Sequence, residues 1–236
     1  MNRALVIGLI GLLAHTLSAA DSSPQDKLNN AAKQLGDKPN YSWTTTMKEG
    51  DGSPGRLGPI EGKAEKSGLT YLSFEIGGIP VEVYMNGQKG AVKALEGWQT
   101  FDEIAQTSSV AAAVVRFLRS YKAPGVESVA FSGKVKDVKE AEGVISGELK
   151  EDTTKEFLEF GTRRREGQEP PKIENPKGAV KFWIKDGTLT KYEFNVQGKV
   201  TAGEREMEVN RTTTIEIKDA GTTKLELPAE AKEKML

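Results

Sequence analysis

The chain has 236 residues, with 33 basic and 34 acidic side chains, one histidine and no cysteine. A formal net charge of −1 provides no concentrated basic surface, so we expect no nucleic-acid partner. His15 lies in an N-terminal apolar segment, and the absence of His and Cys elsewhere excludes Ser-His-Asp triads, Cys-His pairs and zinc or haem sites that use these ligands. We therefore expect a protein that is not an enzyme and has no cofactor or metal.

Residues 1–20 have the pattern of a secretory signal peptide. Arg3 is the positive charge, residues 4–13 are apolar, and Ser18-Ala19-Ala20 has the small side chains that signal peptidase recognises. The apolar run is shorter than the roughly 20 residues that cross a bilayer, which favours cleavage near Asp21 over an uncleaved anchor. We expect a periplasmic or secreted protein, and without cysteine it would have no thiol-linked lipid anchor.

The mature chain is predicted to begin with a short helix and to continue as β-structure. Ser22 or Ser23 can cap the helix, Pro24 suits its first turn, and Gly36 can end it. Alternating runs separated by Gly-rich turns follow at residues 41–47, 60–66, 69–76, 81–85 and 90–95. Because the connections are short, these strands should form an antiparallel meander.

The middle of the chain is predicted to be helical. Thr100 and Glu103 have capping-box spacing, and Pro124 closes the run that follows. That run places on one helical face Val110, Val114, Phe117, Leu118 and Tyr121. We further expect a helical turn at residues 126–131, a strand pair at 134–139 and 144–149, and a third helix from a cap at Asp152 through Phe157, Leu158 and Phe160 to Gly161.

Three long strands are predicted in the last third, at residues 179–185, 191–197 and 207–217, before a terminal helix that starts at Pro228. Their strict alternation is typical of a sheet that is wet on one side and dry on the other, and the apolar stripes of the helices suit them to cover the dry side. We expect residues 21–236 to form one α+β domain, in which a large curved antiparallel sheet of about ten strands, a half-barrel, wraps around helices inserted between its two halves.

This order of elements resembles the LolA/LolB-like lipoprotein-carrier superfamily, which includes LppX/LprG-type mycobacterial lipoproteins and sorts outer-membrane lipoproteins. The strand-turn-strand Lys181-Phe182-Trp183-Ile184-Lys185-Asp186-Gly187-Thr188-Leu189 is similar to the family's late segment. So is the run at residues 212–217, followed by Leu227-Pro228-Ala229-Glu230-Ala231. The resemblance implies a half-barrel whose concave face and covering helices enclose an apolar cavity for acyl chains. The chain departs from the anchored members because it has no cysteine.

Large apolar side chains on the predicted inner faces are the candidate ligand-binding residues. They are Trp43, Phe74, Phe101, Phe117, Leu118, Phe182, Tyr192 and Phe194. Two interpretations stay open: an ordinary filled core, or the lining of a cavity that the helices do not fill.

Arg211 is an unusual residue of the last strand, because counting by twos from Met207 places it on the apolar face. A buried arginine needs a partner, and we expect it to act as a lid residue that pairs with a helix carboxylate, Asp102 or Glu103. The resembled carriers hold their helical lid with an arginine in a different strand, so that role is not carried over. The alternative is a β-bulge that returns Arg211 to solvent.

The leading functional hypothesis is an exported periplasmic carrier that shelters the acyl chain of a lipid or lipoprotein in a hydrophobic half-barrel and exchanges it with membrane-associated donor and acceptor proteins. A second hypothesis is a structural or interaction module with a solid core and no ligand. A third, a hydrolase with two carboxylates, requires two inward acids about 5 to 10 Å apart.

Overall fold

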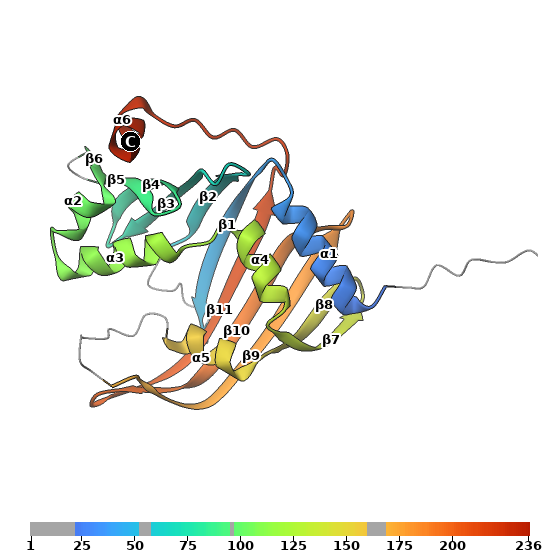
Figure 1. Ribbon diagram of the computed structural model, residues 1–236. Coiled ribbons are helices and arrows are strands. Elements are labelled where there is room, and N and C mark those ends of the chain that lie inside the picture. The colour runs from blue at the N-terminus through green and yellow to red at the C-terminus, as the bar shows by residue number, and fades with distance from the viewer. Residues whose placement is uncertain (1–21, 52–57, 95–96, 160–168) are drawn as a thin grey trace, which may run out of the picture.

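The structure, a computed structural model, describes residues 22–51, 58–94, 97–159 and 169–236. The predicted signal peptide and the predicted helix end at Phe160 and Gly161 lie outside the described residues. The described part confirms the α+β class and the half-barrel: an open, fully antiparallel sheet of eleven strands curves around helices (Figure 1). The predicted number was about ten, and β6, a strand of four residues, was not predicted.

The sheet consists of two meanders joined by the first and last strands. Its order is β6-β5-β4-β3-β2-β1-β11-β10-β9-β8-β7, and the central pair β1–β11 sets Trp43 opposite Ile217. The strands are β1 (Asn40–Glu49), β2 (Ile60–Glu65), β3 (Thr70–Ile76), β4 (Ile79–Asn86), β5 (Lys89–Ala94), β6 (Gly97–Thr100), β7 (Val135–Ala141), β8 (Val144–Leu149), β9 (Lys172–Lys185), β10 (Thr188–Ala202) and β11 (Arg205–Lys218).

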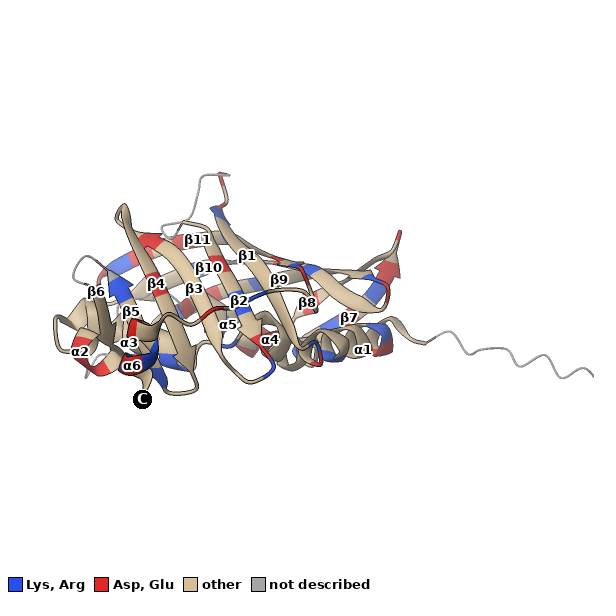
Figure 2. Ribbon diagram, turned by 90° about the horizontal axis from the view of Figure 1, so that it is seen from above, with Lys and Arg blue, Asp and Glu red and all other residues tan. Residues whose placement is uncertain are grey.

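Helices cover the concave face of both meanders. Helices α1, α4 and α5 lie over the half that contains β9 and β10, and α2 and α3 lie over the half that contains β2 to β6 (Figures 1 and 2). A further helix, α6, lies on the opposite face against β5 and β6. The helices are α1 (Pro24–Gly36), α2 (Phe101–Ala105), α3 (Ser109–Ser120), α4 (Pro124–Ser132), α5 (Glu151–Glu159) and α6 (Ala229–Met235).

Side-chain caps fix several helix starts where the sequence predicts them. The Ser23 hydroxyl accepts a hydrogen bond from the Asp26 N–H at the start of α1. Thr100 and Glu103 form the predicted reciprocal capping box at α2. For α5 the predicted cap is wrong, because the helix begins at Glu151 and Asp152 lies within its first turn. The helix dipole favours an acidic side chain at either position, and the sequence placed this boundary two residues late.

Alternation along the long strands forms the core. On β10 the side chains of Tyr192, Phe194 and Val196 are buried on the concave side, while Lys191 on the other side carries its ammonium 4.8 Å from the Trp183 ring centroid. Trp183 is therefore half-buried on the predicted wet face. On the inner face a Cβ at Gly62 would lie 2.1 Å from the Trp43 indole, so glycine makes room for that ring.

The outer face carries a second, smaller core that alternation did not predict. Tyr84 and Trp98 are buried there beneath Leu227 and Ala231 of the C-terminal segment, and the Tyr84 hydroxyl donates to the Glu226 carbonyl at 2.8 Å. The outer-face side chains Tyr84 and Trp98 are thus covered by the C-terminal segment, which is more than 120 residues further along the chain.

Candidate functional site

The eight predicted ligand-binding residues lie in one continuous apolar cluster between the sheet and the helices. Seven are buried and Phe117 is partly exposed. The structure brings them together in space. It also fills much of the volume around them.

The half beneath α4 is densely packed with aromatic rings. Phe131 of α4 lies 5.5 Å from Phe194, 6.1 Å from Phe182 and 6.1 Å from Tyr192, measured between ring centroids. Phe157 of α5 stacks on Phe194 at 4.6 Å. Offset and edge-to-face contacts at these distances are favourable, so this half anchors α4 and α5 to the sheet.

Helix α3 buries only part of the face that the sequence predicts. Val115 and Leu118 are the fully buried residues, whereas Val110, expected on the buried face, is 58% exposed. The apolar surface of α3 is wider than the contact that the sheet offers. The stripe formed by Val110, Val114 and Phe117 therefore lies at the side of the helix, and the last two residues are partly exposed.

This side of α3 belongs to an incompletely covered apolar region, here called the mouth. The lower ends of β1 and β11 pass between α3 and α5 (Figure 1). Partly exposed apolar side chains on these elements define the mouth: Met47 on β1, Val114 and Phe117 on α3, and Phe157 on α5. The surface continues inward through buried neighbours, because Met47 pairs with Thr213, Thr213 pairs with Phe194, and Phe157 stacks on Phe194.

A polar cluster lies inside the half-barrel beside this apolar surface. The Tyr192 hydroxyl of β10 donates to the Glu127 carboxyl group of α4, and the Gly125 N–H donates to the Tyr41 hydroxyl at 2.8 Å. Tyr192 is fully buried. Residue 127 keeps some exposed surface, but its carboxyl group points to that buried hydroxyl.

Burial perturbs the ionisation of this cluster. Desolvation raises the pKa of Glu127, and the hydrogen bond from Tyr192 and the charge of Lys122 oppose the rise. Desolvation also raises the pKa of Tyr41 to about 12 and raises the pKa of Tyr192. The neighbours that act on the pKa of Glu127 are thus a hydroxyl and a cation.

Sequence reasoning did not single out Glu127. The α4 segment, PGVESVAFS, contains Glu127 as its single charged residue. A lone acid in an otherwise apolar or small-residue helix was the signal, but its burial depends on Tyr192, 65 residues away along the chain.

Arg211 lies on the concave side of β11, opposite Val196. Its guanidinium donates to the Phe157 carbonyl of α5 at 2.6 Å, and desolvation lowers its pKa. It therefore contacts a helix, through a backbone carbonyl. Of the two carboxylates expected as its partner, Asp102 lies 2.7 Å from Arg119 and Glu103 lies 3.0 Å from Lys234.

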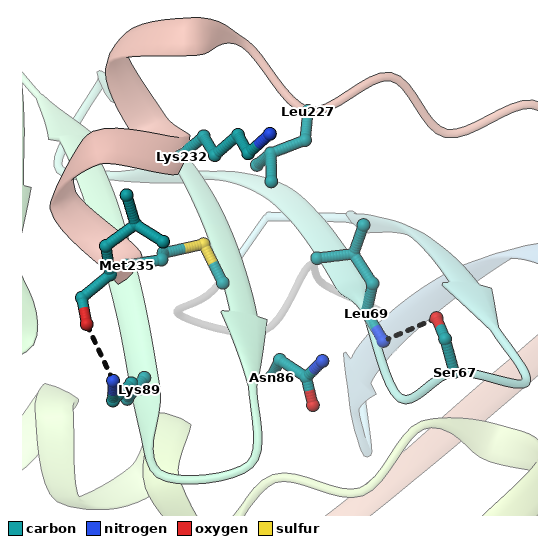
Figure 3. Close-up of a pocket in the computed structure, with 8 residues that line it drawn as sticks. Ser67, Leu69, Asn86, Lys89, Leu227, Lys232 and Met235 are labelled. Carbon is teal, nitrogen blue, oxygen red and sulfur yellow. Dashed lines mark hydrogen bonds between the residues drawn. The ribbon is translucent and has the colours of Figure 1, made fainter.

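Two pockets lie away from the polar cluster and the mouth. The first, of about 420 Å³, opens on the outer face between α6 and the turns after β2 and β4 (Figure 3). There the Lys89 ammonium donates to the Leu236 oxygen at 2.8 Å, and Leu227 and Met235 provide apolar walls. The second, of about 340 Å³, lies beside α1, next to the turn between β7 and β8 and the end of β9.

Within the described ranges, no helix has the length and apolar character of a membrane span. In the same part of the chain, no group of three or more acidic side chains is arranged to hold a metal ion.

Comparison with known proteins gives structural likenesses only. No family model matches the chain, and no curated protein matches it. LprF from Mycobacterium bovis is similar at 11% identity and a TM-score of 0.49, over 88% of this chain and 97% of that one. Lipoprotein LppX from Mycobacterium tuberculosis is similar at 8% identity and a TM-score of 0.44, over 87% of this chain and 98% of that one. A DUF1329 family protein from Desulfovibrio piger gives 9% identity and a TM-score of 0.28, over 84% and 92% of the chains. LppX is of the lipoprotein type that the element order of the sequence resembles.

Proposed function

We propose that the protein is an exported, non-enzymatic binding protein that takes a lipophilic ligand, the acyl chain of a lipid or lipoprotein, at the mouth between α3 and α5. The observation that carries the proposal is the partial exposure of Met47, Val114 and Phe117 beside a continuous apolar inner face. Apolar side chains from a strand and a helix that remain partly uncovered together form a surface that an aliphatic chain can complete.

The polar cluster and the aromatic packing under α4 give this site a fixed wall. Because Phe131 and Glu127 hold α4 on β9 and β10, access through that half would require rings to separate. On the α3 side the Phe117 ring contacts Tyr121 of the segment that follows α3, and Phe117 itself stays partly exposed. The ligand chain would therefore lie along the α3 side of the inner face.

Binding would derive from apolar burial. Each buried methylene contributes about 0.8 kcal/mol, so ten methylenes would give about 8 kcal/mol, which corresponds to a micromolar dissociation constant. Such an affinity allows both retention and release, as transfer between membrane-associated donor and acceptor proteins requires.

The experiment combines extraction with probe binding. The purified full chain is extracted with organic solvent for lipid mass spectrometry, then titrated with a fluorescent fatty acid. We expect bound lipid and saturable uptake that Phe117→Asp lowers at least about tenfold, since a carboxylate at the mouth opposes the apolar chain. The matched control, Val126→Asp, changes an exposed apolar residue on the outer side of α4 and should bind the probe normally.

A second function, an interaction module with a solid core, is favoured by one observation. The rings around Phe131 fill the space between α4 and the sheet, and both pockets lie away from that space. Repeated absence of lipid in the extract, together with no uptake of the fluorescent fatty acid, would establish the module and reject the carrier.

A further inference from the structure

Helix α4 has its polarity reversed relative to an ordinary surface helix. Its one charged residue, Glu127, turns to the buried hydroxyl of Tyr192, while Val126 and Val129 are 61% and 48% exposed. A surface helix normally places charge outward and branched apolar side chains inward. The outer side of α4, completed by the exposed Ala130, is thus an apolar surface with no charge of its own.

The charged residues that precede this surface along the chain are basic. Lys122 lies two residues before the start of α4 and is exposed, as is Arg116 on α3. Arg119, the other cation of α3, forms an ion pair with Asp102. Over residues 109–133 the only acid is Glu127, which faces the interior. An apolar surface that exposed cations precede along the chain complements an anionic lipid surface.

We propose that the outer side of α4 docks on the surface of an anionic bilayer, with Val126 and Val129 inserted at the level of the headgroups and with Lys122 and Arg116 against lipid phosphates. The helix has nine residues, about 14 Å of length, which suits insertion parallel to the surface. Helices α3, α4 and α5 lie on the same side of the sheet (Figures 1 and 2), so docking through α4 brings the mouth close to the membrane.

The test is sedimentation of the full chain with vesicles of phosphatidylcholine, with or without one third phosphatidylglycerol. We expect binding that prefers the anionic vesicles and weakens with salt. Val126→Asp/Val129→Asp should lower the partition coefficient at least about tenfold. Lys122→Gln should lower it about fivefold on anionic vesicles and leave neutral vesicles unaffected.

The matched control is Ile79→Asp, which alters an apolar residue, 38% exposed, at the turn between β3 and β4; it should bind vesicles normally. Equal binding by the double variant and this control would overturn the proposal, as would absence of binding by the unmodified chain. Self-association that light scattering detects and the double variant abolishes, without vesicle binding, would assign α4 to a protein contact and also overturn it.

Membrane docking and ligand binding fail separately in these experiments. Phe117→Asp should lose uptake of the soluble fatty acid and keep vesicle binding, because Phe117 belongs to the mouth. Val126→Asp/Val129→Asp should lose vesicle binding and keep uptake of the soluble fatty acid.

Discussion

Replacing Glu127 with glutamine should change how the stability of the protein depends on pH. Desolvation raises the pKa of Glu127 in the folded state, so the folded protein holds this proton more tightly than the unfolded chain does. The stability that this proton contributes is fully present below the pKa of Glu127 in the unfolded chain. It falls as the pH rises from that value to the raised pKa of the folded state, and above the raised pKa it is lost completely. Glutamine keeps the shape and can still accept from Tyr192, but it does not titrate.

The magnitude follows from the linkage relation. Each unit by which burial raises the pKa of Glu127 removes about 1.4 kcal/mol of stability at any pH above both values. Glu127→Gln should therefore be more stable than the unmodified protein at neutral pH and equal to it in mild acid.

The assay is urea unfolding of both proteins between about pH 4.5 and about pH 8. The difference between the two curves isolates Glu127 from the other acids, and Glu193→Gln on the outward side of β10 is the control that should leave the slope unchanged. The same slope in the Glu127→Gln variant would refute the account of a buried acid held by Tyr192.

Two further predictions concern the contacts that hold the helices on the sheet. Gly125→Ala would place a Cβ 2.8 Å from the Tyr41 hydroxyl and should lower the free energy of unfolding in urea by about 1–3 kcal/mol. At Gly133 a Cβ would lie 3.8 Å from the Ala130 carbonyl oxygen, so Gly133→Ala should be tolerated. Equal effects of the two variants would contradict the close approach at Gly125. Arg211→Met removes the donor to the Phe157 carbonyl and should cost about 1.5–3 kcal/mol with faster amide exchange in α5; an unchanged melting temperature would show that this contact does not hold the helix.

Strand alternation made most of the sheet predictable. Tyr192, Phe194 and Phe182 face the concave side as the period of two requires, and the capping residues at Ser23 and Thr100 carry their signal locally. Short β6 was missed because four residues with one buried side chain do not establish a period.

The remaining features depend on partners distant in the chain. Val115 rather than Val110 is buried on α3 because the sheet decides which part of a wide apolar stripe is covered. Tyr84 and Trp98 are buried on the outer face because the C-terminal segment packs over them. Neither the placement of α6 nor that of Tyr192 opposite Glu127 can be read from a local pattern.

The location of the ligand is tested most directly by photo-crosslinking. The purified full chain is irradiated with a fatty acid that carries a diazirine near the end of its chain, and the adducts are mapped by peptide mass spectrometry. Adducts at Met47, Val114, Phe117 and Phe157 are the predicted result. Two results would contradict an acyl-binding mouth between α3 and α5. One is that adducts form only in the outer-face pocket, at Leu69 and Met235. The other is that an excess of unlabelled fatty acid suppresses no adduct.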